Sequence, residues 1–91
     1  MPHGRGVVSY RGGDLCEGEF RLGSVTGWGV KRFGSGDQYT GHFAAGRMSG
    51  GGRLQFANGD LYEGEFRNDR MHGVGFYKYS NGDWCKLTTT A

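Results

Sequence analysis

A phrase that opens with glycine recurs every 23 residues along this chain of 91 residues. The opening glycines are Gly4, Gly27, Gly50 and Gly73; a second glycine follows each of them two positions later, and a Gly-Asp pair comes after each phrase. A fixed period of this length predicts a stacked array, in which each unit buries its apolar face only against its neighbours. The sequence therefore predicts one repeat domain over residues 1–91, with repeats 4–26, 27–49, 50–72 and a partial repeat 73–91.

The glycine content argues against an array of helices. Twenty residues are glycine, and each glycine inside a helix costs about 1 kcal/mol relative to alanine. Aromatic residues make up 14% of the chain, whereas disordered segments contain few of them. We therefore expect an ordered, all-β array.

One repeat, residues 50–72, shows how the chain is expected to fold. Residues 50–56 alternate with a period of two, as a strand with two different faces does. Asn58-Gly59 should form a tight turn with positive φ at both central positions, and residues 61–66 should return before a longer polar connection over 67–72. The predicted fold is a set of antiparallel hairpins stacked into a single elongated, twisted sheet, with eight strands about 4.8 Å apart in a ribbon roughly 38 Å long.

Stacking in register places the aromatic residues in columns. Nine of them fall into three columns: Tyr10, Phe33, Phe56 and Tyr79; Phe20, Phe43 and Phe66; Tyr39 and Tyr62. Columns of glycine run beside them, either because a ring from the adjoining strand covers each glycine or because glycine sets the curvature of the sheet. Since a single layer leaves one face uncovered, we expect these nine side chains to line a groove that takes a partner segment or a second copy of the chain.

The charged residues of the two kinds of connection differ in sign. Asp14, Asp37, Asp60 and Asp83 follow the first strand of each repeat, where each could close its own turn or contribute to an acidic edge. Arg21, Arg47, Arg67 and Arg70 belong to the opposite connections. They are either solvated loop charges or a basic edge for an acidic protein or anionic lipid, at about 1 kcal/mol each near such a membrane.

The reverse face of the sheet carries both charged and apolar residues. Trp28, Val30 and Phe76 interrupt it with apolar side chains. They are either scattered surface residues or a second adhesive face.

Several functional classes find no support in the sequence. A net charge of +2 without a basic stripe does not indicate nucleic-acid binding. No spacing of His or Cys suggests a metal site, and no phrase indicates a cofactor or a catalytic residue, so we expect no enzyme. Cys16 and Cys85 lie three periods apart, about 29 Å, too far for an internal disulfide. They are interpreted as small apolar residues in the tyrosine column, with an intermolecular bridge or a metal as the alternative.

Three phrases of the chain resemble a known repeat. Tyr62-Glu-Gly-Glu-Phe66, Met71-His-Gly-Val-Gly75 and Asn81-Gly-Asp83 are similar to the MORN repeat (membrane occupation and recognition nexus), and the resemblance covers residues 3 to about 86 in phase. It implies stacked hairpins without enzymatic activity, used as a scaffold or dimerisation module, often in cytoskeletal and ciliary or flagellar assemblies. Some members of that family are joined to catalytic domains. Cys16, Cys85, Leu87 and Thr89 depart from the pattern, so the terminal repeats resemble caps.

The expected function is that of a non-catalytic scaffold for protein partners. The alternatives are a peripheral module for anionic phospholipid that uses the four arginines, or a fragment that supports a catalytic domain in a longer chain. The chain has neither a signal peptide at its start nor an apolar stretch of about 18 residues, so we expect a cytoplasmic location. Only the resemblance points to the cytoskeleton or the cilium.

Overall fold

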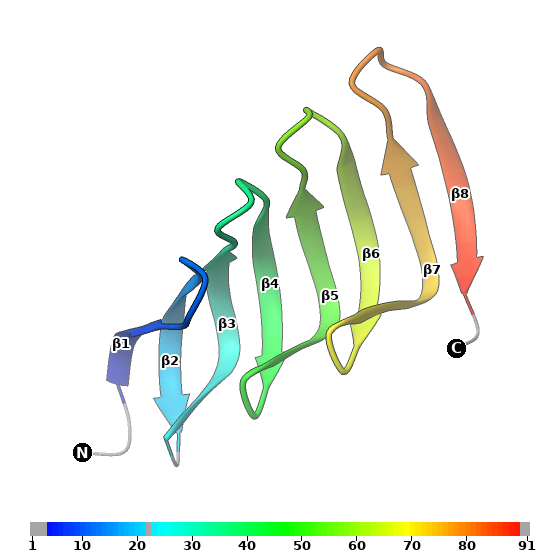
Figure 1. Cartoon of the computed structure of the whole chain (residues 1–91). Helices are drawn as coiled ribbons and strands as arrows, with labels where there is room; N and C mark the ends of the chain where they lie inside the picture. The colour runs from blue at the N-terminus through cyan, green and yellow to red at the C-terminus, as the bar shows by residue number, and fades with distance from the viewer. Residues whose placement is uncertain (1–3, 22, 90–91) are drawn as a thin grey trace.

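The computed structural model describes residues 4–21 and 23–89 as eight antiparallel strands in one open sheet (Figure 1). The strands are β1 (Gly4–Ser9), β2 (Leu15–Arg21), β3 (Ser24–Arg32), β4 (Gln38–Ala44), β5 (Arg47–Gln55), β6 (Leu61–Arg67), β7 (Arg70–Lys78) and β8 (Trp84–Thr89). Each strand pairs with the next in chain order. The predicted array of stacked hairpins is therefore confirmed, and its longest dimension is 45 Å.

A row of glycines crosses the sheet at mid-strand. Gly6, Gly18, Gly29, Gly41, Gly52, Gly64 and Gly75 pair with one another from β1 to β7, and the row ends where Gly75 pairs with Leu87 on β8. A Cβ atom at Gly29 would lie 3.0 Å from the ring of Phe43. One at Gly52 would overlap the ring of Tyr39. The ring-over-glycine interpretation is thus confirmed, and the glycines let aromatic rings lie against the backbone of the next strand.

The glycine that opens each phrase has a separate role. Where one hairpin meets the next, the register shifts opposite residues 18–20, 41–43 and 64–66. Gly27, Gly50 and Gly73 lie at these β-bulges with φ of 92°, 78° and 74°, a region that L-residues with a side chain rarely adopt. The period of 23 residues is therefore the spacing of the bulges.

The lengths of the two kinds of turn are the reverse of those predicted. The tight turns join β4 to β5 and β6 to β7, where Ala45, Gly46, Asn68 and Asp69 all have positive φ. The connection predicted to run over 67–72 is therefore only two residues long, because β7 begins at Arg70.

The turn that contains Asn58 is wider than predicted. The N–H of Phe56 donates to the carbonyl of Asp60 at 2.8 Å, and the N–H of Gly59 donates to the carbonyl of Phe56 at 3.0 Å. Asn58 does not take the left-handed conformation, because its Oδ1 instead accepts from the N–H of Asp60 at 2.9 Å.

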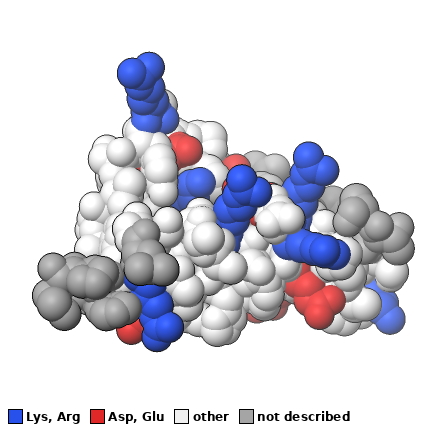
Figure 2. All heavy atoms as spheres, turned by 90° about the horizontal axis from the view of Figure 1, so that it is seen from below, with Lys and Arg blue, Asp and Glu red and all other residues white. Residues whose placement is uncertain are grey.

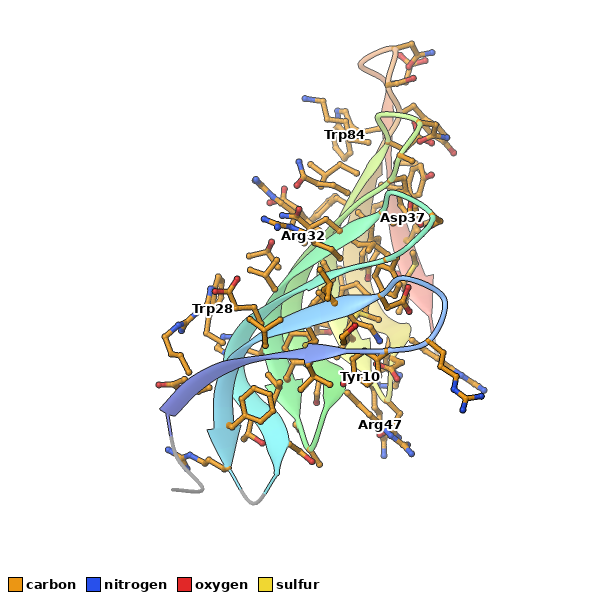
Figure 3. The ribbon with its side chains drawn as sticks, turned by 60° about the vertical axis from the view of Figure 1, so that its left-hand side comes forward. Tyr10, Trp28, Arg32, Asp37, Arg47 and Trp84 are labelled. Atoms are coloured by element: carbon orange, nitrogen blue, oxygen red, sulfur yellow. The ribbon has the colours of Figure 1, made fainter. Side chains whose placement is uncertain are left out.

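The core lies on one face of the sheet. Cys16, Val25, Tyr39, Phe43, Met48, Tyr62 and Phe66 are buried, and the cross-strand pairs place them on the same side. We call this side the core face and the opposite side the outer face. The strands rotate steadily from β1 to β8 (Figure 3). This twist brings rings of neighbouring repeats together, so the single layer covers its own apolar face.

Candidate interaction surfaces

The nine residues predicted to line a groove share the core face, but its centre is closed. Tyr39, Phe43, Tyr62 and Phe66 are each at most 4% exposed. The ring of Tyr39 packs edge-on against Phe43 and Phe66 at centroid distances of 5.2 and 4.9 Å. Its hydroxyl donates to the carbonyl of His42 at 2.8 Å, and burial raises its pKa to about 12. These four residues are core residues, so the expectation that they form an open binding stripe is corrected.

The other five residues lie nearer to solvent. Phe20 is partly buried and packs against the core near the start of the sheet. The remaining four, Tyr10, Phe33, Phe56 and Tyr79, come at the ends of β1, β3, β5 and β7, and we call them the rim row. Tyr10 is 40% and Tyr79 45% exposed, whereas Phe33 and Phe56 are half-buried.

Side chains between the rings bridge two of the three gaps in the rim row. The ammonium of Lys31 lies 5.2 Å from the ring centroid of Tyr10 and 5.1 Å from that of Phe33. Tyr77 fills the corresponding gap farther along, 5.5 Å from Phe56 and 4.9 Å from Tyr79. One edge of the core face therefore presents aromatic side chains from four repeats.

The aspartates beside the rim row join each repeat to the next. The Oδ1 atoms of Asp14, Asp37 and Asp60 accept from the N–H groups of Gly34, Ala57 and Ser80, each at 2.8 Å. Each bond spans 20 residues. For these three aspartates this corrects the expectation that each closes its own turn, whereas Asn58 and Asn81 do bond within their own turns.

Asp60 accepts a second strong hydrogen bond. The hydroxyl of Tyr77 donates to its Oδ2 at 2.7 Å. This bond, together with the one from Ser80, holds the pKa of Asp60 below its ordinary value. The same contact raises the pKa of Tyr77 to about 12. The carboxylate therefore holds Tyr77, the ring that packs between Phe56 and Tyr79.

The four predicted arginines lie together along the edge of the sheet opposite the rim row, which we call the lower edge. Arg21, Arg47, Arg67 and Arg70 are all exposed. Figure 2 views the molecule from this side, and basic side chains project from it at several points. Asp69 of the same edge is engaged, since its Oδ1 accepts from the N–H of Met48 at 2.8 Å. The placement agrees with the predicted basic edge.

The outer face exposes more large apolar side chains than the sequence analysis expected. Val7, Leu15, Trp28, Val74, Phe76 and Trp84 are between 42% and 64% exposed. Figure 3 shows Trp28 and Trp84 on the same side of the ribbon, away from Tyr10. The alternation of the strands indicated this for Trp28 and Phe76, but not how the residues group.

Besides a hollow of about 180 Å³ lined by Val7, Leu15, Glu17, Val30 and Arg32, the outer face has two further, larger hollows. One, of about 300 Å³, is lined by Leu61, Glu63, Phe76, Lys78 and Trp84. The rings of Phe76 and Trp84 meet edge to face there at 5.7 Å. The other, of about 510 Å³, is lined by Trp28, Thr40, His42, Gly51, Gly52, Arg53, Gln55 and Glu63. The guanidinium of Arg53 bonds Glu63 at 2.9 Å on one side of it.

Comparison with known families identifies the repeat. The family model of the MORN repeat matches residues 1–15, 39–61 and 62–84, which together make up more than half of the chain. The chain belongs to the MORN-repeat family. MORN repeats are generally non-catalytic modules for protein or lipid interaction. No curated protein matches the chain.

Two of the three MORN matches begin at buried tyrosines. Segments 39–61 and 62–84 start at Tyr39 and Tyr62, and the unmatched interval 16–38 starts with Cys16 in the same position. This interval nevertheless forms β2 and β3 with the register of the matched repeats, because Cys16 is 1% exposed and fills the position as a small apolar residue.

The described residues hold few groups suited to chemistry. Cys16 and Cys85 are free thiols, and burial raises the pKa of Cys16. Across residues 4–21 and 23–89, no three His, Cys, Asp or Glu side chains meet as a metal site requires. Within these same ranges, no helix is long and apolar enough to cross a membrane. The side chain of Thr89 lies outside the described part of the chain.

Proposed function

We propose that this MORN-repeat protein is a non-catalytic scaffold that binds a segment of a partner protein along the rim row. The observation that supports this proposal is the placement of the rings. The centre of the core face is closed, while four aromatic side chains from successive repeats remain accessible along one edge. Large, rigid aromatic residues are enriched at the energetic centres of protein interfaces.

The spacing of the rings favours a linear segment of the partner. Because Lys31 lies within 5.2 Å of the ring centroids of both Tyr10 and Phe33, these rings are about 10 Å apart at most. Two strand spacings give about the same repeat distance for the whole row. A segment that presents one apolar side chain for each ring would contact all four repeats.

Affinity capture with paired variants tests this proposal. Tyr10→Ser with Tyr79→Ser removes the two most exposed rings of the rim row, and should abolish capture of specific partners without unfolding the sheet. Phe43 and Tyr62 are unsuitable for this test, because their rings are part of the core. A purified partner that binds the double variant as tightly as it binds the wild type would contradict the proposal.

The lower edge supports a second candidate function, peripheral attachment to anionic phospholipid. Four exposed arginines would give weak, salt-sensitive binding of about 1 kcal/mol each. Flotation with phosphoinositide vesicles should then be lost in Arg67→Ser with Arg70→Ser and retained in the rim-row variant. No flotation of the wild type at physiological salt would exclude this function.

The cellular setting is a proposal that depends on the family. Cytoskeletal and ciliary assemblies are the sites to examine first, by imaging the tagged chain in ciliated cells. A diffuse signal away from both structures would count against this setting.

A further inference from the structure

The dipeptide Asn-Gly occurs twice in this chain, at residues 58–59 and 81–82. Asparagine is one of the thermolabile residues of proteins, because the backbone nitrogen of the following residue can attack its side-chain carbonyl carbon. Glycine crowds that nitrogen least, since it has no side chain. The third asparagine, Asn68, is followed by Asp69 and lacks this advantage. Both Asn-Gly dipeptides are exposed, in turns that follow rings of the rim row.

Each of these turns polarises the side-chain amide of its asparagine. In the turn between β7 and β8, Oδ1 of Asn81 accepts from the N–H of Asp83 at 2.9 Å, and Nδ2 donates to the carboxylate of the same residue at 3.4 Å. Asn58 and Asp60 have the same two contacts in the turn between β5 and β6. The N–H would stabilise the negative charge that develops on Oδ1 during attack. The carboxylate lies beside the nitrogen that must leave as ammonia.

A hydrogen bond of the attacking nitrogen restrains the reaction in both turns. The N–H of Gly82 donates to the carbonyl of Tyr79 at 2.9 Å, and the N–H of Gly59 donates to that of Phe56 at 3.0 Å. The nitrogen can attack only while this bond is open. The rate therefore depends on how often each turn opens.

The turn that contains Asn58 is tied to the next repeat. The carboxylate of Asp60 accepts from the hydroxyl of Tyr77 at 2.7 Å and from the N–H of Ser80 at 2.8 Å. A Cβ atom built on Gly59 would lie 3.2 Å from the Cβ of Ser80, so the two turns are in contact. These contacts hold Asp60, whose N–H bonds the side chain of Asn58.

The turn that contains Asn81 has no such restraint. Across the residues that the structure describes, the carboxylate of Asp83 accepts only from Asn81. A Cβ atom built on Gly82 would meet nothing within 4 Å. This last turn should therefore open more often than the turn before it.

We propose that Asn81 is a site of self-modification, converted through a cyclic imide to aspartate and isoaspartate, whereas the bonds of Asp60 protect Asn58. The nitrogen of Gly82 forms a bond to Cγ of Asn81, the Cγ–Nδ2 bond breaks, and Nδ2 leaves as ammonia with the proton of Gly82. Water then opens the imide by adding its hydroxyl to a carbonyl carbon and its proton to the released nitrogen. Opening at Cγ gives aspartate, and opening at the backbone carbonyl gives isoaspartate.

The reaction changes one end of the rim row. Either product adds a negative charge next to Asp83, and isoaspartate lengthens the backbone between Tyr79 and Asp83. The N–H of Tyr79 donates to the carbonyl of Asp83 at 2.7 Å across this turn, so the longer linkage disturbs the bond that closes it. The conversion takes place whether or not the rim row binds a partner.

Incubation of the full chain in neutral buffer, followed by mass spectrometry of tryptic peptides, tests the proposal. Cleavage after arginine and lysine separates the two dipeptides into peptides 54–67 and 79–86. Methylation by an isoaspartyl methyltransferase detects isoaspartate, and a sample digested without incubation gives the baseline. Peptide 79–86 should be converted about tenfold faster than peptide 54–67, because two additional hydrogen bonds hold the earlier turn closed. In urea, the two peptides should be converted at similar rates.

Two variants test the cause of the difference. Asn81→Ser introduces the residue that an earlier repeat has at this position, Ser35, and should abolish conversion of peptide 79–86 while the sheet stays folded. Tyr77→Phe removes one bond to Asp60 and should accelerate conversion at Asn58 severalfold, with little change at Asn81.

Three results would overturn the proposal. One is a folded chain in which Asn81 stays intact over the time that converts half of the sample in urea. Another is conversion at Asn58 as fast as at Asn81 in the folded chain. The third is an unchanged rate at Asn58 in Tyr77→Phe.

Discussion

At the scale of single residues, adjacent glycines have opposite roles. Gly52 lies under the ring of Tyr39, so a Cβ atom has no room there, whereas Gly51 faces open space on the other side of the same strand. Composition alone makes the two positions look alike. What separates them is the neighbouring strand, since an aromatic ring reaches one glycine and nothing reaches the other.

Alanine substitutions measure this difference. Gly52→Ala should lower the free energy of unfolding by about 1–3 kcal/mol, because the methyl group overpacks against Tyr39 and the neighbouring backbone. Gly51→Ala should leave stability unchanged or raise it by about 0.5–1 kcal/mol, because alanine restricts the unfolded chain more than glycine does. Urea denaturation of the two variants provides the comparison, and equal losses of stability would contradict the packing described here.

Asp60 makes stability depend on pH at the acidic end. The hydroxyl of Tyr77 and the N–H of Ser80 hold its pKa in the folded protein below the ordinary value of 3.8. This contribution to stability is therefore fully present above pH of about 4 and is lost as the pH falls through the lowered pKa.

The variant Asp60→Asn tests this linkage. It should be less stable than the wild type at neutral pH, and its free energy of unfolding should change less between pH 5 and pH 3. Tyr77→Phe should flatten the same profile by removing one donor while keeping the ring. Parallel profiles for the wild type and Asp60→Asn would show that the carboxylate has no linked role.

At the scale of elements, the tight turns decide how the hairpins are joined. Ala45 has φ of 51°, and Asn68 has nearly the same φ in the next repeat. Asparagine adopts this conformation far more readily than alanine does, because its short polar side chain can bond locally. The turn between β4 and β5 is therefore mildly strained.

Replacing Ala45 with the residue of the next repeat should relieve this strain. Ala45→Asn is expected to stabilise the protein by about 0.5–1 kcal/mol, seen as a higher melting temperature. Ala44→Asn, one residue earlier and at the end of the strand, serves as the control and should give no gain. A larger gain at Ala44 would show that the left-handed conformation is not the cause.

The sequence predicts the elements better than it predicts their connections. The period of 23 residues and the alternation within it gave the number, order and pairing of the strands, because they depend on local pattern. The turn at Asn58 is wider than predicted, because the Oδ1 of Asn58 accepts from the N–H of Asp60 and Asn58 stays out of the left-handed conformation. The bond from the N–H of Ser80 to Asp60 was missed because its partners lie 20 residues apart. A signal for this bond was available in the sequence. In successive repeats, an aspartate is followed 20 residues later by a small residue that comes directly after the next aromatic residue.

The candidate site was predicted only in part for a similar reason. The aromatic columns and the basic edge followed from register. The burial of Tyr39 and Tyr62 did not, because it depends on the twist that carries a ring onto the next repeat. The hollow at Gly51 was visible in the sequence only as a glycine, inside a predicted strand, at a position where the other repeats carry a side chain.

At the scale of the whole molecule, each hairpin contacts mainly its neighbours in the chain. Sheet pairing, the aspartate bonds and the ring packing all join adjacent repeats. Stability should then be close to a sum of repeat and interface contributions. The exposed surfaces are correspondingly separate: the rim row, the lower edge and the outer face.

Removal of one full period tests this modularity. A chain that lacks residues 27–49 keeps the order of strand types, and should remain a β-sheet with a lower melting temperature, as followed by circular dichroism. A deletion of half a period, residues 27–38, breaks the register and should unfold the chain. If the full-period deletion unfolds as completely as the half-period deletion, the repeats are not independent units.

The central claim is that rings of one repeat lie over the glycines of the next and so close a single-layer sheet. Proton NMR tests it directly, through nuclear Overhauser effects between the ring of Tyr39 and the Hα atoms of Gly52, and between Tyr62 and Gly75. Strong effects at both glycines, with none from the ring of Tyr39 to Gly51, are the predicted result. Absence of both effects in the folded protein, or equal effects at Gly51 and Gly52, would contradict this account.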